Sequence, residues 1–213
     1  MPITKRQGKN STQERIVEAA AKLFSRQGFT GTSTSEIARL AGVSEVTVFR
    51  HFPRKRDLFW AATESRLRRL RISKELRVRL DNDESPNTIL PGIVSLLVDT
   101  FQQQPETIRL LYVSLFELED GAERILRRHL SQVFDPVQSY LARCVAKGSI
   151  RNLEPGVAAV GLAASVAAHQ NLHQMLSVDE GPYTSPEAAV AIYSNFWMKA
   201  LVPEATACIA ALP

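Results

Sequence analysis

The side chains of residues 44–55 could form hydrogen bonds and apolar contacts with a nucleic acid. Glu45 can accept a hydrogen bond from the amino group of cytosine, and Val46 can pack on the methyl group of thymine. Arg50 could bind a guanine or a phosphate, and Lys55 suits a phosphate. The full candidate set for DNA contacts is Ser33, Thr34, Ser44, Glu45, Val46, Thr47, Phe49, Arg50, His51 and Lys55.

Two short helices joined by a turn would place these side chains on one outer face. Ser33 and Glu36 form a capping box that opens the first helix, and Ser44 caps the second one after a turn that contains Gly42. Pro53 stops the second helix. The spacing therefore predicts a helix-turn-helix over residues 33–52. Its inward-facing apolar residues are expected to pack on Leu23 and Phe24 of a preceding helix, and they are Ile37, Val43, Val48 and Phe52.

The charge distribution supports a polyanionic partner. Residues 1–80 carry 18 Lys and Arg against 7 Asp and Glu, whereas residues 81–213 carry 8 against 15. A basic N-terminal part attracts phosphate backbones whatever their base sequence. Helix-turn-helix units also serve as packing elements in proteins that bind no DNA, but the charge and the exposed polar set favour DNA binding here.

Helical periodicity extends over almost the whole chain, and the expected fold class is all-α. We expect a basic N-terminal arm over 1–10, a three-helix DNA-binding domain over 11–54, and one connecting helix over 55–80. Four arginines surround that connecting helix and are interpreted as solvated surface: Arg66, Arg68, Arg69 and Arg71.

The acidic stretch 81–86 is the best domain boundary, and a C-terminal helical domain for effector binding and dimerisation is expected over 81–213. Helices are predicted there at about 87–103, 105–118, 121–148, 154–176 and 185–201, with a short one after Pro203.

The segments Thr32–Ser44 and Thr47–Lys55, followed by Leu58-Phe59, resemble the N-terminal domain of TetR-family transcriptional regulators over about residues 12–60. The resemblance implies an all-helical homodimer whose divergent C-terminal domain binds a small molecule. Members commonly carry a tyrosine where this chain has Phe49, and a basic residue and a glycine where it has Glu45 and Val46. We therefore expect selectivity to depend strongly on base edges.

The C-terminal domain offers weaker signals. Five aromatic residues could line an effector pocket or belong to the core: Phe101, Tyr112, Phe116, Phe134 and Tyr140. A small-residue helix and its successor are candidates for a dimer interface through Ala164, Ala168, Ile192, Phe196 and Trp197. His169 and His173 lie on one helix face, where core or interface hydrogen bonding is favoured over a metal site because no third ligand is evident. Cys144 and Cys208 are interpreted as reduced thiols.

These patterns predict a transcriptional regulator, most simply a repressor that a small hydrophobic or amphipathic effector releases from a pseudo-palindromic operator. The alternatives are a helical interaction module whose basic head binds acidic partners, and an enzyme in the C-terminal domain. No nucleophile motif, metal triad or phosphate loop supports an enzyme, and no cofactor is expected. The sequence has no run of 18 apolar residues and no apolar stretch within residues 1–10, so we expect a cytoplasmic protein.

Overall fold

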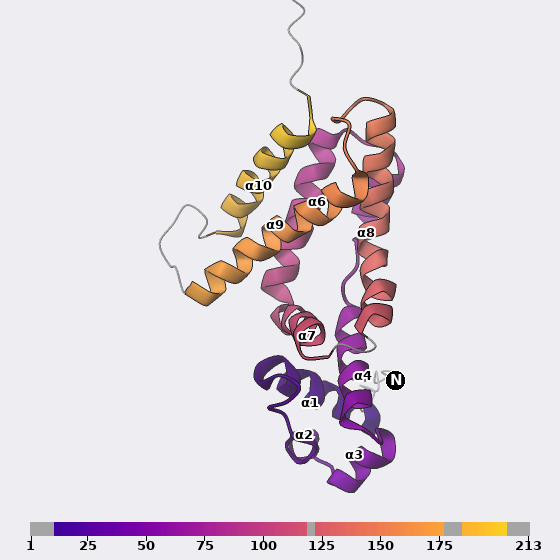
Figure 1. Ribbon diagram of the computed structural model, residues 1–213, viewed down its shortest axis with the longest axis vertical. Helices are drawn as coiled ribbons and strands as arrows, with labels where there is room; N and C mark the ends of the chain where they lie inside the picture. Colours follow the sequence, from indigo (N-terminus) through magenta and orange to yellow (C-terminus); the bar gives the residue numbers. More distant parts are fainter. Residues whose placement is uncertain (1–10, 119–121, 177–184, 204–213) are drawn as a thin grey trace, which may run out of the picture. The chain divides into compact units, whose positions relative to one another are not determined.

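A computed structural model describes residues 11–118, 122–176 and 185–203, and the regular structure in these ranges is entirely α-helical (Figure 1). The predicted all-α class is thus confirmed. The contacts divide the chain into two units, each of which is described by itself. Unit 1 contains the described parts of residues 1–70 and 105–129, and unit 2 contains those of residues 71–104 and 130–213.

Four helices begin unit 1: α1 (Thr12–Gln27), α2 (Thr34–Ala41), α3 (Glu45–His51) and α4 (Lys55–Leu67). The Ser11–Glu14 capping box opens α1, and Gly28 ends it with a positive φ of 75°. Phe24, Ile37 and Val48 are fully buried in one core, as their spacing predicts. This core fixes α2 and α3 on α1.

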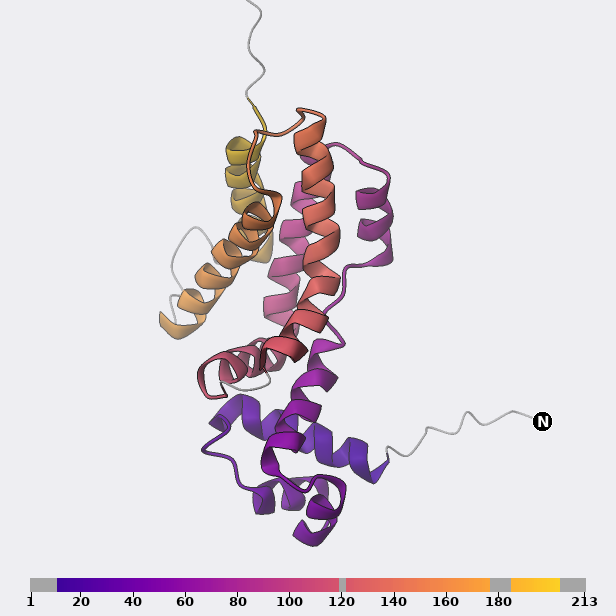
Figure 2. The same ribbon diagram turned by 45° about the vertical axis from the view of Figure 1, so that its right-hand side comes forward.

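Unit 1 also contains α7 (Pro105–Phe116) and the first turns of α8 (Ala122–Ala146). Figure 2 shows α7 beside α1, and α7 also contacts α4. The reason is apolar: Leu110 is fully buried, and Leu118 is 7% exposed, in the same core as Phe24 and Phe59. Burying each of these leucines contributes about 1.5–3 kcal/mol.

The prediction of one helix over 55–80 is wrong. α4 ends at Leu67, residues 68–73 are not helical, and a separate helix α5 (Lys74–Asp81) follows. Ser73 caps α5 by accepting a hydrogen bond from the N–H of Leu76 at 3.1 Å. Serine competes for backbone hydrogen bonds, so it favours a helix start over a helix interior.

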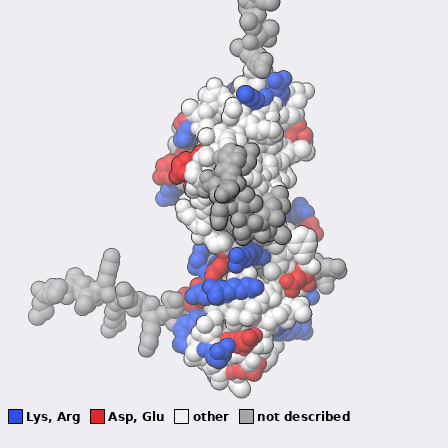
Figure 3. Space-filling view, turned by 90° about the vertical axis from the view of Figure 1, so that its left-hand side faces the viewer, with Lys and Arg blue, Asp and Glu red and all other residues white. Residues whose placement is uncertain are grey.

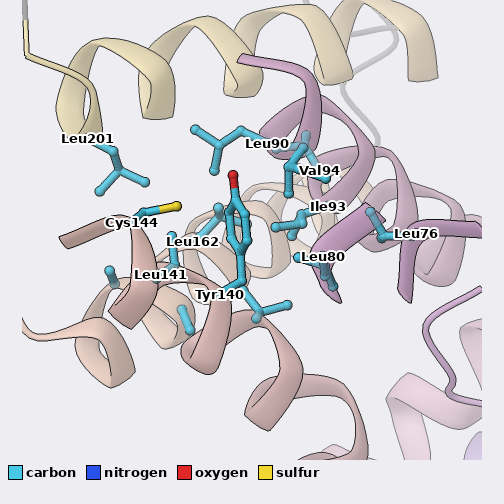
Figure 4. Packing of buried hydrophobic residues seen from close by; sticks show 14 of the residues in the cluster. Leu76, Leu80, Leu90, Ile93, Val94, Tyr140, Leu141, Cys144, Leu162 and Leu201 are labelled. Carbon is cyan, nitrogen blue, oxygen red and sulfur yellow. The ribbon is translucent and has the colours of Figure 1, made fainter. Parts of the chain in front are cut away.

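Unit 2 contains α5, α6 (Pro86–Gln103), the rest of α8, α9 (Pro155–Leu176) and α10 (Pro186–Leu201). α6 packs on α5, α9 and α10, and Tyr140 of α8 is fully buried among apolar residues that include Leu90 and Leu162 (Figure 4). Its hydroxyl donates to the carbonyl of Glu84 at 2.8 Å, and its burial raises the pKa of that hydroxyl.

The helix ranges predicted beyond residue 86 match α6–α10 within two residues at each end. Pro136 lies inside α8 without dividing it. Cys144 is a buried free thiol. The expected N-terminal arm, the short helix after Pro203 and Cys208 lie outside the described residues. Within the described ranges, no helix is long and apolar enough to cross a membrane.

Candidate nucleic-acid interface

The structure forms the predicted helix-turn-helix from α2, a turn and α3. The Ser33 hydroxyl accepts from the N–H of Glu36 at 3.2 Å, and the Glu36 carboxylate accepts from the N–H of Ser33 at 3.0 Å, which lowers the pKa of Glu36. Gly42 adopts a left-handed conformation with φ of 66°, which glycine reaches at little steric cost. The N–H of Val43 then donates to the carbonyl of Ala38 at 3.0 Å and closes the end of α2.

α3 buries one residue and presents the rest of its surface to solvent. Val48 is fully buried, whereas Val46 is 77% and Phe49 is 45% exposed. Arg50 and His51 are exposed at the C-terminal end of the helix. The structure therefore brings the predicted DNA-contacting side chains of α3 to a solvent-accessible surface of unit 1.

Three hydrogen bonds organise the N-terminal end of α3. The Thr34 hydroxyl of α2 donates to the Glu45 carboxylate at 2.5 Å. The Ser44 and Thr47 hydroxyls lie 2.8 Å apart, and the Ser44 hydroxyl accepts from the N–H of Thr47. The Thr34 hydroxyl thus orients the Glu45 carboxylate at the N-terminal end of α3.

Lys55 lies at the start of α4 with its ammonium nitrogen 4.5 Å from the ring centroid of Phe29. A cation over an aromatic face is stabilised by the ring quadrupole. The Phe29 ring is itself held by Phe24 at 5.9 Å and by Phe59 at 5.5 Å between centroids. The position of the Lys55 charge thus depends on the α1–α2 loop that carries Phe29.

Arg15 is a positioning residue that the sequence patterns missed. Its guanidinium donates to the carbonyl of Ala41, and to that of Gly42 at 2.9 Å. These carbonyls accept no hydrogen bond from within α2. The Arg15 guanidinium supplies the missing donors, and its positive charge is favourable at the C-terminal end of the helix. An arginine on an amphipathic helix carries no local signal that would identify this partner.

The interpretation of Arg66 as solvated surface is wrong. Arg66 is 2% exposed and forms two hydrogen bonds of 2.8 Å to the two carboxylate oxygens of Glu18. A third, of 2.9 Å, reaches Glu106 of α7. The hydrogen bond from Arg66 lowers the pKa of the Glu18 carboxyl. One buried cation therefore joins α1, α4 and α7.

The five aromatic residues proposed for a pocket fall into both units. Phe101 and Tyr140 are buried in unit 2, and Phe134 packs against the core that contains Tyr140. Tyr112 and Phe116 belong to unit 1, where their rings stack at 6.2 Å.

An open cavity of about 660 Å³ in unit 2 contains none of these five aromatic residues. Its lining is Arg71, Ile72, Arg77, Asp81, Ser131, Gln132, Asp135, Pro136 and Ser139. The predicted pocket residues and the observed cavity are therefore different sets.

The proposed dimer residues lie on α9 and α10. Ala164 and Ala168 are exposed, as are Ile192 at 37% and Phe196 at 59%. Trp197 instead packs inward, and its indole N–H donates to the Ser165 hydroxyl at 3.0 Å. Figure 3 views the side of unit 2 that carries these helices, and few charged side chains appear over its visible part.

His169 is half-buried, with its ring 5.5 Å from that of Tyr193, and the side chain of His173 lies outside the described residues. The described part of the chain contains no group of three or more His, Cys, Asp or Glu side chains placed to hold a metal ion.

The family model for bacterial regulatory proteins of the tetR family matches residues 16–62, which contain most of α1 and α4 and all of α2 and α3. Residues 16–62 therefore form a DNA-binding domain of the TetR-family type. A TetR-family protein is a DNA-binding transcriptional regulator and not an enzyme.

Two relatives of this TetR-family protein extend the likeness beyond α1–α4. The nucleoid occlusion factor SlmA of Marinomonas sp. (strain MWYL1) is 28% identical over 147 residues, which cover 67% of this chain and 70% of the relative. The HTH-type transcriptional regulator AcrR of Shigella flexneri is 27% identical over 148 residues, which cover 66% of this chain and 67% of the relative.

Solved structures share the fold of this TetR-family protein. A protein from Saccharomonospora viridis in complex with choline has a TM-score of 0.71 at 18% identity and covers 90% of this chain and 98% of its own. AibR in complex with isovaleryl coenzyme A and operator DNA has a TM-score of 0.66 at 18% identity. The match covers 87% of this chain and 97% of AibR. At such identities the likeness concerns the fold alone.

Proposed function

We propose that this TetR-family protein is a repressor that binds a pseudo-palindromic operator as a homodimer and is released by a small effector. The observation that carries the proposal is the exposed face of α3. It presents Glu45, Val46 and Arg50 from a helix whose Ser44 cap, Val48 anchor and turn are all in place. Such a helix enters the major groove with its N-terminal residues against base edges.

Selection from random DNA duplexes tests sequence-specific binding. We expect enrichment of one two-fold symmetric site, and binding that weakens steeply with salt while keeping its preference. Failure to enrich any sequence would contradict the proposal and favour the alternative of a basic head that binds acidic proteins.

Repeating the selection with Glu45→Ala tests base reading. Because the Thr34 hydroxyl orients the Glu45 carboxylate, we expect the preference to relax at one position of each half-site, by about 1–3 kcal/mol. Glu45 does not read bases if the variant selects the same consensus with the same stringency.

The apolar residues on the surface of α9 and α10 support a dimer through these helices. Val157 and Val160 of α9 are 70% and 57% exposed, and helical spacing places them on the same face of α9 as Ala164, while Ile192 and Phe196 are exposed on α10. A two-fold axis through this surface would repeat one apolar patch on both protomers. The two copies of α3 would then read half-sites about 34 Å apart.

The cavity in unit 2 supports an effector with both polar and apolar parts. Arg71, Arg77, Asp81 and Asp135 offer ionic groups, while Ile72 and Pro136 offer apolar contact. A compound screen that measures melting shifts would identify such an effector, with operator release as the second readout. The release mechanism requires different affinities of the effector for two conformations. Equal separation of the two copies of α3 in operator-bound and effector-bound forms would refute it.

A further inference from the structure

Glu117 lies directly after α7 and holds the loop between α1 and α2. Its Oε2 atom accepts from the N–H of Phe29 at 2.9 Å and from the N–H of Thr30 at 3.1 Å, and it lies 3.4 Å from the Thr30 hydroxyl. The three donors are 87 or 88 residues away from Glu117 in the sequence. Two successive backbone N–H groups that converge on one carboxylate form an anion-binding nest.

Gly28 allows the carboxylate to come this close. A Cβ atom at position 28 would lie 2.5 Å from the Oε1 atom of Glu117, inside van der Waals contact. Gly28 also has a φ of 75°, so the residue that ends α1 shapes the nest as well. We infer that Glu117 is a positioning residue for DNA binding, one that sets the placement of α2 and of Lys55 without touching DNA.

The contacts of Glu117 with Phe29 and Thr30 are called the clamp here. Its first consequence concerns α2. The Thr32 hydroxyl donates to the carbonyl of Gly28 at 2.8 Å, and Ser33 then caps α2. Because the loop is this short and internally bonded, its position determines where α2 begins. Arg15 holds the other end of α2, so both ends of the helix that carries α3 are fixed from outside the helix-turn-helix.

The second consequence concerns Lys55. The backbone of Phe29 is held by Glu117, and the ring of Phe29 lies under the Lys55 ammonium at 4.5 Å. Loss of the clamp therefore removes the backbone restraint on Phe29 and leaves its ring held by Phe24 and Phe59 alone. A single carboxylate thus influences two elements of the proposed DNA-contacting surface.

The direction of the change in operator affinity distinguishes a positioning role of Glu117 from a purely electrostatic one. Removing a negative charge from a DNA-binding protein strengthens its attraction to phosphates. The clamp predicts the opposite for Glu117: operator binding should weaken about tenfold in Glu117→Ala, because charge-assisted hydrogen bonds are among the strongest in proteins. Glu117→Gln keeps the shape and one acceptor but loses the charge, so its operator affinity should lie between those of the wild type and Glu117→Ala.

Glu123→Gln is the matched control. The Glu123 side chain is 81% exposed, belongs to the same unit and pairs with Arg127 one helical turn away. Its removal changes the net charge equally and leaves the loop untouched. Full-length wild type, Glu117→Ala, Glu117→Gln and Glu123→Gln would be titrated with the selected operator and with a scrambled duplex, after thermal melting shows each to be folded.

Amide hydrogen exchange at Phe29 and Thr30 provides a readout that does not depend on DNA. We expect slow exchange in the wild type and in Glu123→Gln, and exchange at least about tenfold faster in Glu117→Ala. Equal operator affinities of Glu117→Ala and Glu123→Gln, or unchanged exchange at both amides, would overturn the inference.

This inference rests on specific operator binding, and its failure can be told apart from failure of the proposed function. If the wild type selects no sequence, the proposed function fails. If the wild type selects an operator that Glu117→Ala binds equally well, only the role of Glu117 fails.

Discussion

Arg66 is the buried cation of unit 1, and its replacement by methionine gives a direct test of what joins α1, α4 and α7. Methionine keeps an unbranched apolar chain about as long as the aliphatic stem of arginine, so the substitution removes the guanidinium and its hydrogen bonds while the packing of the stem is kept. Glu18 and Glu106 would then face each other without the guanidinium that lies between them.

The size of the effect follows from the exposure of the partners. Removing one member of a fully buried ion pair costs about 3–5 kcal/mol. Here the Arg66 side chain is 3% exposed, but those of Glu18 and Glu106 are 39% and 33% exposed, so water can solvate them again. We therefore expect a loss of about 2–3 kcal/mol in the free energy of unfolding, because solvation discounts the cost for a buried pair. For a chain of this length the melting temperature should fall by roughly 5–10 °C.

The assay is thermal unfolding followed by circular dichroism at neutral and acidic pH. Arg66 lowers the pKa of Glu18 below its usual 4.5 in the folded state. A carboxyl with a lowered folded-state pKa contributes stability that is fully present above the unfolded pKa and is lost as the pH falls through the folded pKa. The difference in melting temperature between wild type and Arg66→Met should therefore be constant near neutral pH and shrink below about pH 4.5.

Arg68→Met serves as the control for this prediction. Arg68 lies two residues from Arg66, and its side chain is 64% exposed and pairs with Glu64 at 3.3 Å. An exposed pair of this kind is worth at most about 1 kcal/mol. Equal melting temperatures of the two variants, or an effect of Arg66→Met that is the same at pH 7 and at acidic pH, would show that Arg66 does not stabilise unit 1 through Glu18 and Glu106.

Three further substitutions test the remaining contacts. Lys55→Ala should weaken binding to all duplexes similarly and lower the salt slope by about one unit, measured by titration at several salt concentrations; an unchanged slope would exclude a phosphate contact. Arg15→Met should lower the free energy of unfolding by about 1 kcal/mol, because it leaves the last carbonyls of α2 without a donor, and denaturant titration would detect this loss. Phe196→Glu should convert the dimer to a monomer of 23.7 kDa in sedimentation experiments, because a carboxylate would be buried in the apolar contact, and an unchanged dimer would place the interface elsewhere.

The helix-turn-helix could be predicted from the sequence because its signals are local. Ser33 and Glu36 are three residues apart, and Gly42 alone in the turn needs a positive φ. Each of these features is determined by neighbours within one helical turn, so residue types and spacing suffice to identify it. Ser73 was also a local signal, but the apolar spacing of the surrounding residues favoured an unbroken helix.

The contacts that hold the helix-turn-helix could not be predicted in the same way. Arg15, Arg66 and Glu117 find their partners 26 to 88 residues away. A charged residue on an amphipathic helix has the same local pattern whether it is solvated or, like Arg66, buried against a carboxylate. Aromatic residues pose the same problem, since Tyr140 is fully buried and Phe116 is 80% exposed.

The length of α3 explains why these distant contacts matter for DNA binding. α3 has seven residues and buries Val48 alone, and an isolated helix of this length is not stable in water. Its orientation must therefore come from α2, to which the turn and the Thr34–Glu45 hydrogen bond attach it. α2 is in turn held by contacts from α1 and from the end of α7. It follows that substitutions at Arg15 and Glu117 should change operator affinity without any contact to DNA. Base preference should change with residues on α3 and with Thr34 and Ser44, which hold its N-terminal end.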